Sequence, residues 1–321
     1  MHGGGSEAAV TTGGYVHDAL LYGTDEELLR DAVPFLRAGV EAGETTMVVG
    51  TERTAALLRD GLDGDPPVRF ASSAEVYRRT PQTILAFREL LEREVAAGTR
   101  RVRVIGEVVF GQHPATWSKW THYEAVINHA LAPYPAWGVC IFDTRQLPAE
   151  VLAAVELTHP YLRAGASRVS NPRYLEPAEV LRRLPDAGPD PLEATQPALE
   201  VEDLTDLWRL RQQLHDALAG SALASETKGE FVFAVSEVAT NAVRHGRPPV
   251  RVRAWVTPGR LLCTVTDHGA GIGDPFAGYL PVHSAPFREG QGLWLARSLC
   301  DHVTFHRTAD GFTVRLATGA G

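Results

Sequence analysis

The sequence predicts two domains, an α/β domain with a parallel sheet followed by a smaller α+β domain. The chain has 321 residues, which is enough for two ordinary domains. Its first half alternates helical with strand-like segments, and this order is typical of a parallel sheet covered by helices on both faces. Its last third groups strands into hairpins, which favours helices packed on one face of a mostly antiparallel sheet.

Composition and charge restrict the class of protein. Apolar residues make up 44% and charged residues 22%, so we expect a buried core. The formal net charge of −8 argues against direct binding to nucleic acid. The first residues contain no apolar run for a signal peptide, and no later run reaches ~18 apolar residues. We therefore expect a cytoplasmic protein without a membrane partner. The cysteines, Cys140, Cys263 and Cys300, lie among apolar residues and are interpreted as reduced core thiols.

The elements of the first domain can be predicted in chain order. Residues 1–13 are small and polar and are expected to be disordered, and the domain itself is placed at 14–180. A helix is predicted over 24–43, because Thr24 is an N-cap residue before an acidic first turn and Gly43 ends the pattern. The segments that follow are a strand at 45–50, helices at 51–62 and 81–98, a strand at 101–110, a helix at 120–131 and a strand at 137–143.

Residues 181–200 are rich in proline and acidic residues and are predicted to be a linker. The second domain is placed at 201–321. Its predicted elements are helices at 203–219 and 225–245, strands at 250–257 and 260–267, a loop with glycine and proline, a helix at 292–300 and strands at 302–308 and 311–316.

Three short motifs in the second domain carry possible chemistry, although each is weak by itself. On the helix at 225–245, Glu237 and Asn241 lie one turn apart, opposite an apolar stripe that should pack on the sheet, namely Phe231, Val235, Val238 and Ala242. An isolated pair of this kind is usually a solvated polar face. The second motif is D-x-G-x-G, Asp267 to Gly271, directly after an apolar strand. In the third, Gly290 and Gly292 precede a helix, where backbone N–H groups can approach a phosphate.

In this order the three motifs resemble the Bergerat ATP-binding fold of the GHKL superfamily. The segment "SEVATNAVRHG" (236–246) and the short loop before the last helix more narrowly resemble the RsbW-like anti-sigma-factor serine kinases. The resemblance implies an α+β ATP-binding sandwich with ATP and Mg²⁺ as ligands. It implies that Asn241 ligates Mg²⁺ through its side-chain oxygen, as a hard cation prefers, and that Glu237 is the general base.

The same resemblance implies the other nucleotide-binding residues. Asp267 would accept a hydrogen bond from the adenine amino group, and Gly269 and Gly271 would let the loop pass close to the base. The phosphates would be held at the start of the last helix, by Gly290, Gly292 and Leu293. Thr313 would support adenine through water. Arg288 would either neutralise the γ-phosphate or be a solvated arginine of the loop.

Three functions are compatible with these motifs. The RsbW-like resemblance implies a serine/threonine kinase, in the form of a homodimer, that phosphorylates a STAS-type anti-anti-sigma protein and sequesters a sigma factor. An ATP-dependent partner switch without phosphotransfer is the alternative. A sensor histidine kinase would need a helical dimerisation hairpin between its phosphorylated histidine and the ATP site. His215 lies only 22 residues before Glu237, so we interpret it as a surface residue of the domain's first helix. His245 at the end of the next helix is read as a dipole-satisfying residue.

The first domain lacks a phosphate-binding loop, because the segment "TTMVVGTERTAALL" (45–58) has neither the second glycine nor the lysine of that motif. ATP hydrolysis is therefore not expected there. The segments "HDALLYGTDEELL", "VIGEVVF", "WSKWTHYEAVINHAL" and "GVCIFDTRQLP" resemble the MEDS sensory-domain family, which implies a RecA-like three-layer α/β domain without the P-loop.

Candidate residues for a small-ligand pocket lie near predicted strand ends or on one helix, where α/β sheets place ligands. They are His17, Glu107, Trp117, Trp120, Tyr123, Glu124 and Asp143. Some of these residues also have a purely structural interpretation. Trp120, Tyr123 and Ile127 have helical spacing and can equally be a core stripe, and Asp143 can simply cap the end of its strand.

Overall fold

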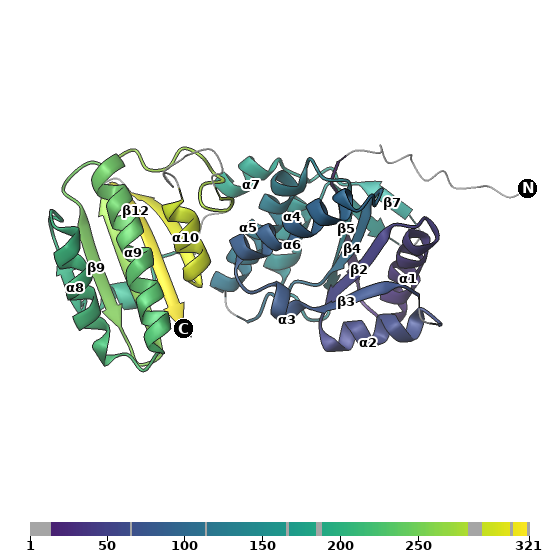
Figure 1. The fold of residues 1–321 in the computed structure, drawn as a ribbon, viewed down its shortest axis with the longest axis horizontal. Coiled ribbons are helices and arrows are strands. Elements are labelled where there is room, and N and C mark those ends of the chain that lie inside the picture. Colours follow the sequence, from purple (N-terminus) through teal and green to yellow (C-terminus); the bar gives the residue numbers. More distant parts are fainter. Residues whose placement is uncertain are drawn as a thin grey trace, which may run out of the picture. The chain divides into compact units, whose positions relative to one another are not determined.

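The computed structural model describes residues 14–64, 66–112, 114–164, 167–183, 188–281, 291–308 and 311–319. The chain divides into two compact units, each with its own sheet (Figure 1). The first holds most residues up to Val180, and the second holds the residues from Leu181 onward together with the short stretches Arg79–Ile84 and Gly111–His122. The predicted disordered segment 1–13 lies outside the described residues. Within the described part of the chain, no helix combines the length and apolarity needed to cross a bilayer.

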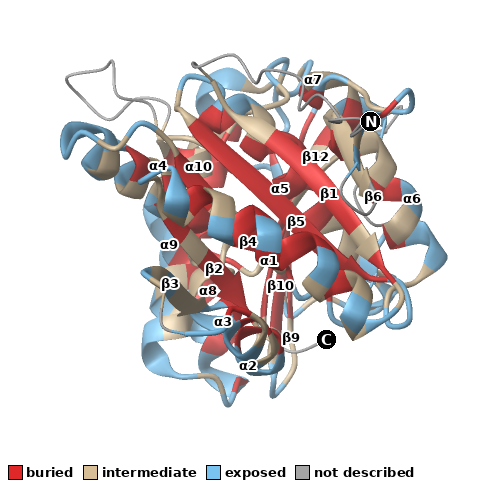
Figure 2. Ribbon diagram, turned by 90° about the vertical axis from the view of Figure 1, so that its right-hand side faces the viewer, coloured by how far each residue is buried: buried red, intermediate tan, exposed pale blue. Residues whose placement is uncertain are grey.

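The first unit contains a seven-stranded sheet, counted over the described residues, with the strand order β3-β2-β4-β5-β1-β6-β7. All paired neighbours are parallel except β7, which runs antiparallel to β6. Every residue of the central strand β5 is buried, as expected for a parallel strand covered on both faces (Figure 2). The strands are β1 (Val16–Tyr22), β2 (Thr45–Gly50), β3 (Val68–Ser72), β4 (Val102–Gly106), β5 (Ala136–Asp143), β6 (Tyr161–Ala164) and β7 (Ser167–Ser170).

Helices cover both faces of this sheet. The core on one face joins α1 and α2 to the strands through residues such as Leu28, Leu36 and Leu58. The start of α1 confirms the predicted N-cap, because the Thr24 side chain accepts a hydrogen bond from the Glu27 N–H at 3.2 Å. The helices of the unit are α1 (Asp25–Glu41), α2 (Glu52–Gly61), α3 (Ser73–Val76), α4 (Thr80–Ala96), α5 (Pro114–Leu131), α6 (Ala149–Thr158) and α7 (Pro177–Arg183).

Two predicted elements of the first unit differ in extent from the structure. The strand predicted over 101–110 ends at Gly106, and the next residue, Glu107, accepts a hydrogen bond from the Thr51 N–H at the start of α2. The helix predicted over 120–131 already begins at Pro114. The strand β1, which lies between β5 and β6, was not among the predicted strands.

The second unit contains an antiparallel five-stranded sheet in the order β11-β12-β10-β9-β8, again counted over described residues. This confirms the predicted antiparallel sheet with helices. The elements are η1 (Pro191–Ala194), β8 (Leu199–Val201), α8 (Leu207–Ala217), η2 (Leu218–Gly220), α9 (Ser225–His245), β9 (Arg251–Val256), β10 (Arg260–Asp267), α10 (Gly292–Leu299), β11 (His302–Thr308) and β12 (Gly311–Gly319).

The helices of the second unit share one core with one face of its sheet. The predicted stripe of α9, which includes Phe231 and Val235, is buried together with Leu261, Cys263 and Val265 of β10. The helix predicted over 203–219 begins only at Leu207. The reason is that Asp206 is the N-cap, since its carboxylate accepts hydrogen bonds from two N–H groups of the first turn.

The opposite face of the same sheet is partly covered by residues 188–198, which we call the outer-face segment. Leu192 packs against Trp255, Leu262 and Ala317. Asp190 forms an ion pair with Arg260 at 2.6 Å, and the Trp255 indole donates a hydrogen bond to the Thr195 carbonyl at 3.0 Å. These residues belong by composition to the predicted linker, and in the structure they pack on the second unit.

Candidate functional site

A cavity of about 230 Å³ opens in the second unit beside α9, the end of β10 and β12. Its wall is mostly apolar with a few polar groups, which is typical of a small-ligand site. The lining residues are Val238, Asn241, Ala242, His245, Gly246, Val265, Asp267, Gly271, Ile272, Leu293, Phe312 and Val314.

Glu237 and Asn241 face the first residue of α10. A Cβ atom placed on Gly292 would lie 3.1 Å from both the Glu237 Oε2 and the Asn241 Nδ2 atoms. The amino end of a helix carries partial positive charge and free N–H groups, so it can bind an anion. A carboxylate and an amide oxygen are also ligands that suit a hard cation. The structure therefore brings the acid–amide pair to the predicted phosphate-binding glycine.

Asp267 lies at the end of β10 in the cavity wall and is only 6% exposed. Its Oδ1 atom accepts hydrogen bonds from the Gly269 N–H at 2.6 Å and from the Arg247 N–H at 3.2 Å. The backbone of Gly246 also packs directly against this carboxyl group, where any side chain would overlap it. Backbone N–H groups around the loop after β10 thus fix the orientation of the Asp267 carboxylate, the group that the family resemblance predicts to bind the adenine amino group.

The second glycine of the D-x-G-x-G motif is required by two independent features. Gly271 has φ +69°, a left-handed conformation that side chains strain. A Cβ atom there would also overlap the ring of Phe312. Gly273, two residues later, has open space around it.

Thr313 is not brought to the cavity. Phe312 and Val314 line it, and because side chains alternate along a strand, Thr313 points to the other face of the sheet. There its hydroxyl forms a hydrogen bond with that of Thr266 at 2.8 Å. The predicted contact of Thr313 with adenine does not fit this placement. Arg288 and Gly290 lie outside the described residues. His245, read from the sequence as a dipole-satisfying residue, also lines the cavity.

Glu107 and Asp143 of the first unit lie at strand ends but are engaged in loop structure. The Glu107 carboxyl group accepts a hydrogen bond from the Thr51 N–H at 2.7 Å, so it occupies a backbone donor at the start of α2 that a phosphate-binding loop would need. Asp143 accepts hydrogen bonds from Arg145 and Gln146, and the bond from the Arg145 side chain is the main reason that its pKa falls to about 2.

The aromatic candidates on α5 are mainly part of the core. Trp120 and Tyr123 are 3% exposed and Ile127 is 2% exposed, as the core-stripe interpretation expects. The indole of Trp117 donates a hydrogen bond to the Gly111 carbonyl at 3.0 Å. Tyr123 and Ile127 nevertheless also line a small apolar cavity of about 30 Å³ together with Tyr15 and Tyr77.

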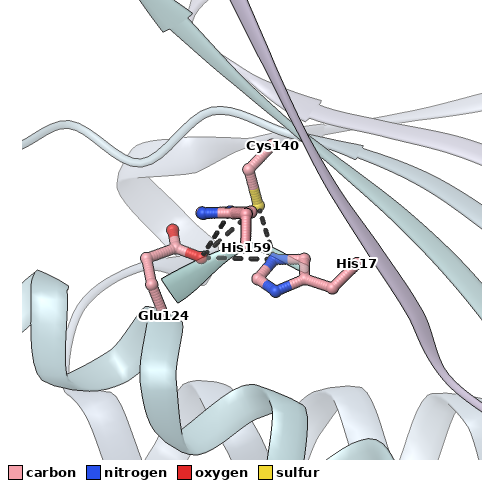
Figure 3. A group of neighbouring side chains, drawn as sticks. All are labelled: His17, Glu124, Cys140 and His159. Carbon is pink, nitrogen blue, oxygen red and sulfur yellow. Dashed lines mark hydrogen bonds and ion pairs between the residues drawn. The ribbon is translucent and has the colours of Figure 1, made fainter. Parts of the chain in front are cut away.

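His17 and Glu124, the remaining candidates, meet two residues that the sequence analysis did not select, Cys140 and His159. Figure 3 shows the four side chains pointing toward one another, and their nearest nitrogen, oxygen and sulfur atoms all lie within 4.8 Å of one another. His17 is on β1, Glu124 on α5, Cys140 on β5, and His159 directly follows α6. We call these residues the buried cluster. The sequence predicts only a core thiol for Cys140, and no local pattern marks His159.

Burial controls the ionisation of the cluster. It lowers the pKa of His17 to about 4 and that of His159 to about 3, and it raises the pKa of the Glu124 carboxyl and of the Cys140 thiol. Both imidazoles of the cluster are therefore expected to be uncharged.

Comparisons with known proteins find a different family model for each of two parts of the chain. Residues 16–160 match the family model of MEDS, the methanogen/methylotroph DcmR sensory domain, and residues 201–318 match that of the histidine kinase-like ATPase domain. No curated protein matches the chain. Among solved structures, the RsbU and RsbW domains of Rv1364c from Mycobacterium tuberculosis are similar at 21% identity with a TM-score of 0.29. That match covers 39% of this chain and 32% of the other, so it spans about a third of that protein.

Proposed function

We propose that this chain, in which a MEDS sensory domain precedes a histidine kinase-like ATPase domain, is an ATP-dependent serine/threonine protein kinase of the anti-sigma type. Its substrate would be a STAS-type anti-anti-sigma protein, its second partner a sigma factor, and its active form a homodimer. The first domain, a RecA-like fold without a P-loop, would control this activity. One observation carries the proposal, namely the approach of Glu237 and Asn241 to Gly292 beside the cavity that holds Asp267.

The cavity residues divide the work of binding ATP. Asp267, with one carboxylate oxygen already held by backbone N–H groups, would orient adenine, and the apolar wall would exclude water from the base. The amino end of α10, with Gly292 and Leu293, would receive the phosphates. Asn241 would hold Mg²⁺, which would neutralise the phosphate oxygens during transfer.

Glu237 would act on the substrate rather than on the nucleotide. It is half-buried and one helical turn from Asn241, so its carboxylate can accept the proton of an attacking serine or threonine hydroxyl near the phosphates. Such a base contributes roughly 10²- to 10⁴-fold to the rate. The remaining assistance would come from positioning and charge neutralisation.

The test is transfer of radiolabel from ATP to a STAS protein by the purified full chain. Glu237→Gln should reduce transfer by about 10²- to 10⁴-fold while Mg-ATP still binds in calorimetry. Asn241→Ala should weaken Mg-ATP binding as well. Glu226→Gln is the matched control, because Glu226 is exposed in the first turn of the same helix, and this variant should behave as wild type.

The outcomes separate the competing functions. Tight Mg-ATP binding without transfer to any STAS protein would instead support a nucleotide-dependent partner switch. Acid-labile phosphate on the chain itself would support a histidine kinase. Against the latter, His215 is exposed on α8, a helix of only 11 residues, and α9 begins eight residues after that helix ends.

A further inference from the structure

The buried cluster of the first unit has the spacing of a metal site. Ligand atoms that surround one tetrahedral ion at the usual bond lengths of 2.0–2.3 Å lie about 3.3–3.6 Å from each other. In the structure, the Glu124 Oε2 atom lies 3.4 Å from the His17 Nε2, 3.6 Å from the His159 Nε2 and 3.5 Å from the Cys140 Sγ. The His17 Nε2 lies 3.1 Å from the Cys140 Sγ. Three of these four separations match the edges of such a tetrahedron.

Hydrogen bonds behind the cluster fix which nitrogen each histidine presents. Asn128 donates through its Nδ2 to the carbonyl oxygens of Glu124 at 3.0 Å and Thr158 at 2.8 Å. Its Oδ1 is therefore an acceptor, and the His17 Nδ1, 3.1 Å away, must donate to it. The neutral ring of His17 consequently turns an unprotonated Nε2 toward the cluster.

His159 is arranged in the same way. Its Nδ1 lies 2.9 Å from the Val155 carbonyl oxygen, which can only accept, and 3.0 Å from the Thr158 hydroxyl. The hydroxyl proton has acceptors of its own in the Ala154 and Val155 carbonyl oxygens at 3.2 Å, so we assign the ring proton to Nδ1, and the Nε2 then presents a lone pair to the cluster. Ring contacts with His17 at 4.1 Å and with Phe142 at 5.4 Å between centroids hold the imidazole in place. Backbone or side-chain acceptors behind each imidazole are the usual second layer of a metal site.

The cluster alone leaves buried acceptors without donors. Two imidazole nitrogens, the Glu124 carboxyl group and the Cys140 thiol converge within 4.8 Å of one another. Among the described residues, the Glu124 Oε1 and the His159 Nε2 are buried without a hydrogen-bond partner. Unsatisfied buried polar atoms are costly, so their presence here calls for a ligand.

We propose that His17, Glu124, Cys140 and His159 bind one divalent transition-metal ion of the Zn²⁺ class. A thiolate and two imidazoles favour Zn²⁺ and similar ions over Mg²⁺ and Ca²⁺, which prefer oxygen ligands. The Cys140 thiol loses its proton to water when the ion binds. The ion then satisfies both imidazole lone pairs and the carboxylate, and it joins β1, β5, α5 and the end of α6.

The same ion would supply the polar element of the small-ligand cavity. His17, Glu124 and Cys140 line that cavity together with Tyr15, Tyr77 and Tyr123. Its volume of about 30 Å³ suits a molecule of very few atoms, since one water needs ~10–15 Å³ on this measure. A metal in its wall gives the first unit a chemical means to bind such a molecule. This inference is independent of ATP binding in the second unit.

Cobalt(II) is the probe for the test, because a thiolate ligand gives it a near-ultraviolet charge-transfer band and tetrahedral geometry gives it intense visible absorption. The full chain, stripped with a chelator, should bind one Co²⁺ with both signals, and Zn²⁺ should displace it. Cys140→Ser should remove the charge-transfer band. The matched control is Cys263→Ser, since Cys263 is also a buried cysteine but lies in the core of the second unit.

Two results would overturn the proposal. One is a stripped wild-type chain that binds neither ion in stoichiometric amount, and the other is an unchanged charge-transfer band in Cys140→Ser. Circular dichroism of each metal-free variant checks folding. Should Cys140→Ser not fold, Asn128→Ala takes its place, because loss of the hydrogen bond behind His17 should weaken Co²⁺ affinity by about 10- to 100-fold. Unchanged affinity in Asn128→Ala would then count against the site.

Discussion

The two sites of this chain are built in opposite ways. In the second unit, an open cavity is shaped by backbone, with glycines at positions where a side chain would collide with Asp267 or Phe312. Its polar residues Glu237 and Asn241 are only half-buried. In the first unit, four side chains that are each at most 9% exposed meet inside the core. The open site depends on space for a large ligand, and the closed one depends on the precise meeting of side chains.

This difference separates binding from stability. In the open site, the half-buried polar residues Glu237 and Asn241 can be replaced with little effect on the fold. Residues of a closed cluster contribute to packing and to polar satisfaction at the same time, so their loss affects both the fold and the ligand. Three substitutions can break or sharpen this contrast.

The largest effect on stability is expected for His159→Ala in the metal-free chain. The ring is 0% exposed and packs between His17 and Phe142, so its loss leaves a cavity and should cost about 3 kcal/mol of unfolding free energy. The corresponding substitution in the open site, Asn241→Ala, should change the free energy of unfolding by less than ~0.5 kcal/mol. Urea unfolding of both variants measures the difference. Equal losses would show that the two sites are not different in this respect.

A middle-sized effect is expected for Gly271→Ala. The left-handed backbone and the clash with Phe312 together should strain the binding-competent form of the loop by about 1–2 kcal/mol. If the loop relieves this strain by shifting in the free protein, the same free energy is lost on binding, which corresponds to roughly tenfold weaker Mg-ATP affinity. Gly273→Ala is the control in the same loop, because its Cβ would meet open space. Calorimetric titration with Mg-ATP measures the affinity of both variants. Identical affinities would contradict a steric requirement for glycine at position 271.

The smallest effect is expected for Asp143→Asn, which tests a charged pair outside both sites. The pKa of Asp143 is lowered to about 2 in the folded chain, so its contribution is present above the unfolded value of ~3.9 and is lost as pH falls through 2. Because Arg145 is partly exposed, we expect about 1 kcal/mol at neutral pH. The difference between wild type and variant in unfolding free energy should shrink between about pH 4 and pH 2. A difference that is constant over this range would contradict the assignment.

The same contrast explains what could be predicted from the sequence. The open site is encoded by local motifs on consecutive elements, and the order of these motifs carries the family resemblance from which Glu237, Asn241, Asp267 and Gly292 could be proposed as site residues. Thr313 could not, because a strand places alternate residues on opposite faces and spacing alone does not say whether Phe312 or Thr313 turns inward.

The closed cluster could be predicted only in part. His17 and Glu124 were selected for their positions near a strand end and on one helix. Cys140 and His159 were missed, because the cluster depends on which strands become neighbours. The sheet places β1 directly beside β5, with Ala19 opposite Cys140, although these residues are more than a hundred positions apart. No local pattern contains that pairing.

The outer-face segment determines where the ATPase half can be cut from the chain. A recombinant fragment that starts at residue 201, where the family match begins, would strip Leu192 from Trp255 and remove the carboxylate that pairs with Arg260. Such a fragment would expose the Trp255 side chain on its sheet and would be expected to self-associate. A fragment that starts at residue 188 keeps this face covered, so self-association seen only with the shorter piece would be an artefact of its boundary.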